Sequence, residues 1–193
     1  MPNRPKPIRV KVDFSPLNKF RSQMKRDLRR SSDGPVRRGL RQVATRYMGF
    51  VRTLFVKRSQ GNGEWEPLKP STVKRRRKGG KKRGGNNSPT VNQAATGGSV
   101  AILRDTSTLF SALGAQSKAS LKQDTVNGVM VGIKDGVQHK SGNATIADIA
   151  RYHHLGSGDL PERKIFEDPD KQTTQAMVEI MGRAARKLMK DSQ

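Results

Sequence analysis

The chain has three histidines, and two of them, His153 and His154, are adjacent in the stretch IARYHHLGSGDLPERKIFED. Neighbouring histidines beside a Gly-Ser-Gly turn could bind a metal ion or act as a general base. A zinc site needs three or four ligands, however, and adjacent residues on a helix point about 100° apart. No acidic residue stands in a ligand pattern such as HExxH, and His139 falls in an expected loop. The sequence therefore predicts no metal site.

Other catalytic patterns are missing as well. The chain has no cysteine, which excludes disulfides, thiolate zinc sites and cysteine nucleophiles. No serine has a GxSxG context, and residues 156–159 (GSGD) follow an expected helix, so they lack the helix N-terminus that binds phosphate. Glu64 and Glu66 flank Trp65 in an irregular segment and form no acid–base pair. We expect no enzyme, no cofactor and no small-molecule substrate; a nuclease-like enzyme using the adjacent histidines is the weakest alternative.

Charge is the most informative property of the sequence. Among 193 residues, 39 Lys and Arg oppose 16 Asp and Glu, which gives a formal net charge of +23 and a pI near 11.2. Such a surface favours polyanions or strongly acidic protein faces as partners. Apolar residues make up 32% of the chain, below the roughly 45–50% of ordinary domains, so we expect a modest core.

The positive charge is densest in residues 74–83, which include eight basic side chains. No aromatic residue occurs between Trp65 and Phe110, so the stacking of single-stranded bases is not favoured. The segment indicates contact with a duplex backbone or an acidic protein groove, and the alternative is a solvated loop without a partner. The candidate contacts are Lys74, Arg75, Arg76, Arg77, Lys78, Lys81, Lys82 and Arg83.

The hydrophobic pattern predicts an α+β fold in which a small mixed or antiparallel sheet packs with a long helix and a C-terminal helix. In the first half we expect a strand over residues 8–14, a helix from Ser15 and Pro16, and a second helix over residues 36–55, capped by Ser32 or Asp33. Residues 1–193 are interpreted as one domain, with a flexible basic insertion at about residues 60–100, rich in Gly, Pro, Ser and Asn.

The second half alternates short elements. We expect a strand at residues 100–103, a short helix capped by Asp105 or Thr106, and a hairpin that turns at Asn127. A helix over residues 143–155 should end at Gly156. A strand at residues 163–167 and a final helix opening at residues 168–169 complete the expected elements.

No segment is expected to enter a membrane. The N-terminal residues have no apolar core of a secretory signal, and no stretch approaches the roughly 18 apolar residues that span a bilayer.

Three blocks of the sequence, in order, carry a resemblance to a known family. The blocks are EWEPLKPSTVKRRRK, then ILRDTSTLFSAL, then IARYHHLGS followed by LPERKIF, with a strand ending in VMVGIKDG between the last two. Together they resemble the virion-morphogenesis, or tail-completion, proteins of tailed bacteriophages. The chain departs from that pattern at Ser107, Glu162 and Lys164, where a glycine, a small residue and a proline are usual. The matching positions are Trp65, Pro67, Leu68, Thr72, Ile102, Leu103, Asp105, Thr106, Leu109, Ala150, His153, Gly156, Pro161, Arg163 and Phe166.

The resemblance implies a non-enzymatic subunit of the phage neck or upper tail, which completes the tail or joins it to the head. It implies partners of three kinds: other copies of the chain in a ring, neighbouring neck, portal-adaptor or tail-terminator proteins, and genome DNA in the channel. The expected place is the virion, after assembly in the bacterial cytoplasm. The motif positions would be structural or interface residues, with His153 as a structural contact and His154 exposed. The alternative, favoured by charge alone, is a nucleic-acid-binding protein of ribosomal or nucleoid type.

Overall fold

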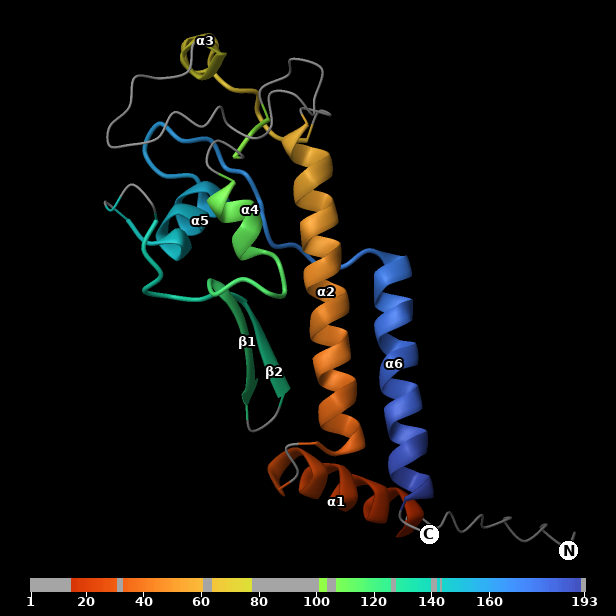
Figure 1. The fold of residues 1–193 in the computed structure, drawn as a ribbon. Helices are drawn as coiled ribbons and strands as arrows, with labels where there is room; N and C mark the ends of the chain where they lie inside the picture. Colours follow the sequence, from red (N-terminus) through yellow and green to blue (C-terminus); the bar gives the residue numbers. More distant parts are fainter. Residues whose placement is uncertain are drawn as a thin grey trace, which may run out of the picture.

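The computed structural model describes residues 15–30, 33–60, 64–77, 101–103, 107–125, 128–139, 142 and 144–191 (Figure 1). The helices are α1 (Ser15–Arg30), α2 (Pro35–Ser59), α3 (Pro70–Arg77), α4 (Thr108–Ala112), α5 (Ile146–Leu155) and α6 (Lys171–Lys190). The strands β1 (Ser120–Thr125) and β2 (Gly128–Ile133) pair antiparallel and form a two-stranded sheet. The predicted α+β class is confirmed, and the predicted strand at residues 8–14 lies outside the described residues.

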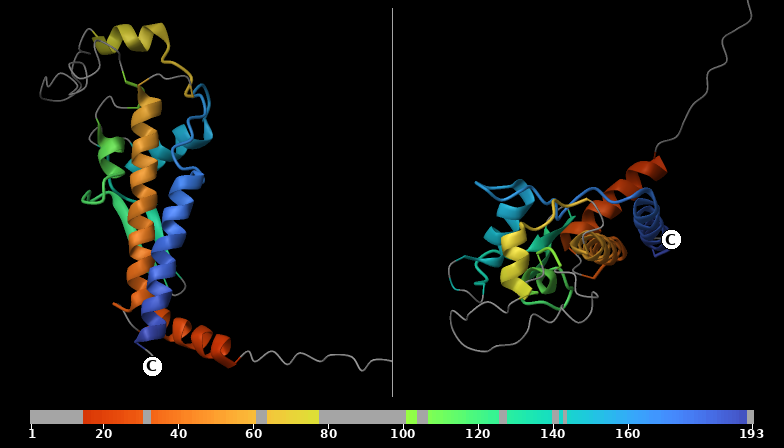
Figure 2. Two further views of the ribbon diagram at one scale, coloured as in Figure 1. Left: turned by 90° about the vertical axis from the view of Figure 1, so that its right-hand side faces the viewer. Right: turned by 90° about the horizontal axis from the view of Figure 1, so that it is seen from above.

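Two long helices form the axis of the molecule. α2 and α6 run side by side in opposite directions, and the hairpin lies on the other side of α2 from α6 (Figure 1, Figure 2). Gly39 lets the helices approach, because a Cβ atom there would lie 2.8 Å from the Cβ of Ala184. α6 begins at Lys171, slightly later than predicted, because Asp170 is its N-cap and accepts a hydrogen bond from the Thr173 N–H at 2.7 Å.

The core lies at the C-terminal half of α2, where α4, α5 and the segment before α3 converge. The ring of Phe55 is 1% exposed and meets the indole of Trp65 edge to face at 5.3 Å. Phe110 lies 6.0 Å from Phe55 between ring centroids, and Leu113 and Ile165, each 1% exposed, close the cluster. Trp65 was expected in an irregular segment, and its burial joins that segment to the core.

The insertion expected at residues 60–100 differs from a continuous loop. Trp65 anchors the chain at its start, and Pro70 then opens α3 as its first residue. The amides of Thr72 and Val73 both donate to the carbonyl of Lys69, at 2.9 and 3.1 Å. Four of the eight predicted contact residues therefore lie on a helix, and residues 78–100 lie outside the described part of the chain.

Two predicted strands are wrong. Residues 101–103 form a turn, in which Leu103 has φ 56° and the Ile102 N–H donates to the Ser59 carbonyl at 2.8 Å. Residues 163–167 pair with no described strand, because the amides of Arg163 and Ile165 bond elsewhere. The N–H of Arg163 donates to the His153 carbonyl at 2.6 Å, and the N–H of Ile165 donates to the imidazole of His154.

The corner between α1 and α2 is fixed by two residues of opposite charge. Neither predicted cap holds: Gly34 is the N-cap of α2, and the buried carboxylate of Asp27 in α1 accepts the Val36 N–H at 2.8 Å. Any side chain at position 34 would collide with that carboxylate. The buried guanidinium of Arg37 donates to the carbonyls of Thr125 and Gly128, at 2.6 and 3.1 Å, and so fastens the hairpin to this corner.

We expect the fold to lose stability in acid. The side-chain hydrogen bond from Arg58 lowers the pKa of Glu167, and the corresponding bond from Arg41 lowers the pKa of Asp124. The unfolded chain then binds more protons than the folded one, so the free energy of unfolding should be constant near neutral pH and fall below about pH 4. Urea unfolding at a series of pH values measures this. In Glu167→Gln, the free energy of unfolding should depend less steeply on pH in acid. An unchanged pH dependence in that variant would contradict the role given to Glu167.

Among the described residues, no helix combines the length and apolar character that a bilayer crossing requires.

Candidate functional site

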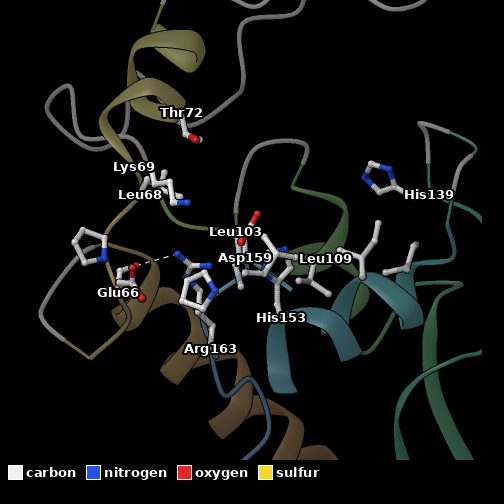
Figure 3. A pocket seen from close by; sticks show the side chains of 15 residues that line it. Glu66, Leu68, Lys69, Thr72, Leu103, Leu109, His139, His153, Asp159 and Arg163 are labelled. Carbon is white, nitrogen blue, oxygen red and sulfur yellow. Dashed lines mark hydrogen bonds between the residues drawn. The ribbon is translucent and has the colours of Figure 1, made fainter. Parts of the chain in front are cut away.

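A pocket of about 410 Å³ opens at the end of the molecule that carries α3 (Figure 3). One wall comes from the segment before α3 and includes Leu68. Leu109 of α4 and Ile149 of α5 form the apolar floor, and Pro161 and Arg163 close the remaining side. The pocket thus joins four segments that are far apart in the sequence.

α5 positions the side chains that face this pocket. Thr145 caps the helix with a reciprocal pair of bonds: its hydroxyl accepts the Asp148 N–H at 3.1 Å, and the Asp148 carboxylate accepts the Thr145 N–H at 3.4 Å. The helix ends at Gly156, as predicted, with φ 70°. The last turn therefore holds both adjacent histidines at a defined place.

The roles of the two histidines differ from the prediction. The Nδ1 atom of His154 accepts hydrogen bonds from the N–H groups of Ile165 and Phe166, at 3.1 and 3.4 Å. His154 is thus half-buried and holds the chain that follows α5, whereas we expected it to be exposed. His153 lines the pocket with its side chain and accepts the Arg163 N–H through its carbonyl. Because Nδ1 of His154 accepts, neutral His154 has its proton on Nε2.

Arg163 links the two ends of the site. Its side chain is buried, with 4% exposure, and its Nη2 atom donates to the carbonyl of Glu66 at 3.0 Å (Figure 3). The same residue is bound through its backbone to the end of α5. One arginine therefore holds the segment carrying Trp65 against the segment that follows Gly156.

Substitution of Gly156 tests this turn. A Cβ atom at position 156 would lie 3.1 Å from the backbone nitrogen of Glu162 and 3.2 Å from the carbonyl oxygen of Leu160, and the positive φ is strained for alanine. We expect Gly156→Ala to lower the free energy of unfolding by about 1–3 kcal/mol, measured in urea. Gly158→Ala is the matched control, because its φ is also positive, at 57°, but no atom lies near its added Cβ. Equal losses of unfolding free energy in the two variants would contradict the close contact between position 156 and the backbone of residues 160–162.

The structure brings together most motif residues of the phage resemblance. Trp65 lies in the core, Phe166 packs against it, and Gly156 forms the turn. Asp105 and Thr106 lie outside the described residues. Eight motif residues line the pocket: Pro67, Leu68, Thr72, Leu103, Leu109, His153, Pro161 and Arg163.

The four basic residues at positions 74–77, on α3, do not line this pocket. Lys74 is exposed on α3, and Arg75, Arg76 and Arg77 belong to the same helix. The remaining members, Lys78, Lys81, Lys82 and Arg83, are outside the described part. A second basic element, α1, lies at the opposite end of the long helices and was not predicted as a binding site (Figure 1). The sequence feature that could have indicated this element is the helical spacing of its Lys and Arg residues, which places them on one side of the helix.

The side chains that line the pocket are arranged more like a binding surface than like a reactive centre. His139, His153 and Asp159 all line the pocket. Within the described ranges, however, no three or more His, Asp or Glu side chains are grouped closely enough to hold a metal ion. What the geometry provides is an apolar recess with a polar rim.

Comparisons with protein-family models, with curated proteins and with solved structures give no match to this chain. Function is therefore inferred from the residues and their arrangement.

Proposed function

We propose that the protein is a structural subunit of the neck or upper tail of a tailed bacteriophage. It completes the tail or joins it to the head, assembles as a ring of identical copies around the DNA channel, and acts by binding rather than by catalysis. Its partners are its own copies, neighbouring neck, portal-adaptor or tail-terminator proteins, and the genome DNA. Its place is the virion, after assembly in the host cytoplasm.

The observation that supports this proposal is the convergence of the three resemblance blocks. Trp65 of the first block packs in the core beside Leu109 of the second, and Arg163 of the third bonds to Glu66 in the first. Residues that share no local pattern therefore depend on one another for their positions. This is the behaviour of positions that maintain a fold or an interface, in keeping with an assembly subunit.

The shape and charge of the chain fit the same role. α2 has 25 residues and, at about 1.5 Å per residue, spans roughly 37 Å alongside α6. A ring of such subunits would multiply a charge of +23 around a channel, which favours DNA or acidic neighbouring rings. The pocket would receive a side chain from an adjacent subunit.

Virion composition tests the proposal. Purified particles of the phage that encodes this chain, examined by quantitative mass spectrometry, should contain it at a fixed low copy number. A nonsense mutation in its gene should yield unjoined heads and tails. Absence of the protein from particles, together with normal particles in the mutant, would overturn the proposal.

The second candidate is a nucleic-acid-binding protein of ribosomal or nucleoid type, favoured by the net charge of +23. It predicts a monomer or dimer that co-purifies with ribosomes or the chromosome. Fractionation of cells that express the protein without other phage genes distinguishes the two.

A further inference from the structure

Over residues 18–29, whose side chains the structure describes, α1 is a two-sided helix, and its exposed side is entirely polar. At 100° per residue, its exposed positions fall within roughly 160° of arc, and its half-buried or buried positions occupy the opposite side. The inward side includes Phe20, Met24 and Leu28. The exposed residues are Asn18, Lys19, Arg21, Ser22, Lys25, Arg26 and Arg29.

The charge of this exposed face is not neutralised within the described chain. Asp27 is the only acid of α1, and it is buried and bound to the first amides of α2. None of the five exposed cations forms an ion pair with any described residue, whereas Arg41 and Arg58 each contact two carboxylates. Holding five like charges on one face is unfavourable in the free protein, and a polyanion would relieve that repulsion.

The face is held in a fixed orientation. The Asp27 carboxylate binds α1 to the start of α2, and the guanidinium of Arg37 donates to the carbonyl of Leu28 in α1. Both anchoring groups are buried. A preorganised row of cations binds a regular row of charges with less loss of conformational entropy than a loop does.

Further cations lie close by on α6. α6 ends at the same end of the molecule as α1, and the two helices are in contact there (Figure 1). Arg183, Arg186, Lys187 and Lys190 are exposed in its last two turns. This end is distant from α3, so it is separate from the basic residues at positions 74–77 (Figure 1).

We propose that the exposed face of α1 binds the phosphate backbone of a nucleic-acid duplex without reading its sequence. The face has no aromatic residue on which an unpaired base could stack, which disfavours a single strand. It also has no apolar residue, whereas the centre of a protein interface is typically apolar or aromatic. An acidic protein is therefore the less suitable partner.

The dimensions suit a duplex. The cations from Lys19 to Arg29 extend along about 15 Å of helix, at about 1.5 Å per residue. B-form DNA has about one charge per 1.7 Å of axis, so a segment of this length presents about nine phosphates. If all five cations contact phosphates, the slope of log affinity against log salt concentration gains about −0.9 for each.

Two variants with equal loss of charge test the proposal. In the first, Lys19, Arg21, Lys25, Arg26 and Arg29 are replaced by Gln. In the control, five exposed lysines scattered elsewhere are replaced by Gln: Lys57, Lys69, Lys118, Lys134 and Lys171. Residues 74–83 are unchanged in both. Binding to a fluorescently labelled DNA duplex of random sequence is measured over a range of salt concentrations, with circular dichroism to verify the helix content.

The α1 variant should bind the duplex at least ~10-fold more weakly than the control variant, with a salt slope smaller in magnitude by up to about 4.5, which is about 0.9 for each cation removed. Equal weakening in both variants would overturn the proposal, because only net charge would then matter. Binding of polyglutamate that is lost in the α1 variant while duplex binding is retained would also overturn it, in favour of an acidic protein. If the fivefold variant does not fold, the double variants K19Q/R21Q and R26Q/R29Q are compared with K118Q/K134Q.

The proposal deepens the DNA contact of the proposed function but is measured on the purified chain. It therefore stands or fails independently of whether the protein is found in virions.

Discussion

Phe55→Ala is expected to destabilise the protein more than any other single truncation in the core. Phe55 is 1% exposed, meets Trp65 edge to face and lies beside Phe110. Truncation of a buried phenylalanine costs about 3–5 kcal/mol through lost transfer energy and the resulting cavity. Total stabilities are typically 5–15 kcal/mol, so the variant should have a melting temperature lower by about 10 °C or be largely unfolded.

The measurement uses the only tryptophan of the chain, Trp65, as its reporter. Loss of the Phe55 ring should expose the indole and shift its fluorescence to longer wavelength before global unfolding. Phe55→Leu retains most of the buried volume and should lower the free energy of unfolding by about half as much as Phe55→Ala does. Val178→Ala is the surface control, because Val178 is 59% exposed, and it should leave the melting temperature unchanged. A Phe55→Ala protein as stable as this control would contradict the assigned core.

The elements that the sequence predicted correctly are those with a local signal. The apolar stripe of α2, the hairpin pairing of β1 with β2 and the glycine after α5 depend on residues a few positions apart. The strand at residues 163–167 was wrong because alternating side chains do not reveal the partner of the backbone. Its amides bond to His153 and to the imidazole of His154, which precede it by about ten residues.

Long-range contacts also explain what was missed in the candidate site. Trp65 stands among Gly, Pro and charged residues, and its segment is held by contacts that are distant in sequence, with the ring of Phe55 and the side chain of Arg163. The prediction of a basic site followed the local density of Lys and Arg, which is highest in residues 74–83. α1 has a lower density of basic residues, but its one carboxylate, at Asp27, is buried and bonded to α2, so all charged residues on its exposed face are basic. That distinction needs the structure.

Among the polar motif residues of the resemblance that the structure describes, Arg163→Ala is expected to have the largest effect. Its guanidinium is buried and donates to the Glu66 carbonyl, while its backbone is bound to His153. Removing the side chain leaves a cavity and breaks a hydrogen bond from a charged donor, each of which costs about 1–3 kcal/mol. We expect a loss of about 2–4 kcal/mol in urea unfolding.

The loss should be local before it is global, because Arg163 holds the segment that carries Trp65. Arg163→Ala should therefore shift the fluorescence of Trp65 to longer wavelength in native buffer, at temperatures where α2 and α6 remain helical by circular dichroism. Arg163→Lys separates charge from geometry: an ammonium keeps the charge but lacks the planar guanidinium, so only partial recovery is expected. Full recovery by lysine would show that charge alone matters. Unshifted fluorescence in Arg163→Ala would mean that Trp65 is held without this arginine, and the motif position would then have to act at an interface rather than in the fold.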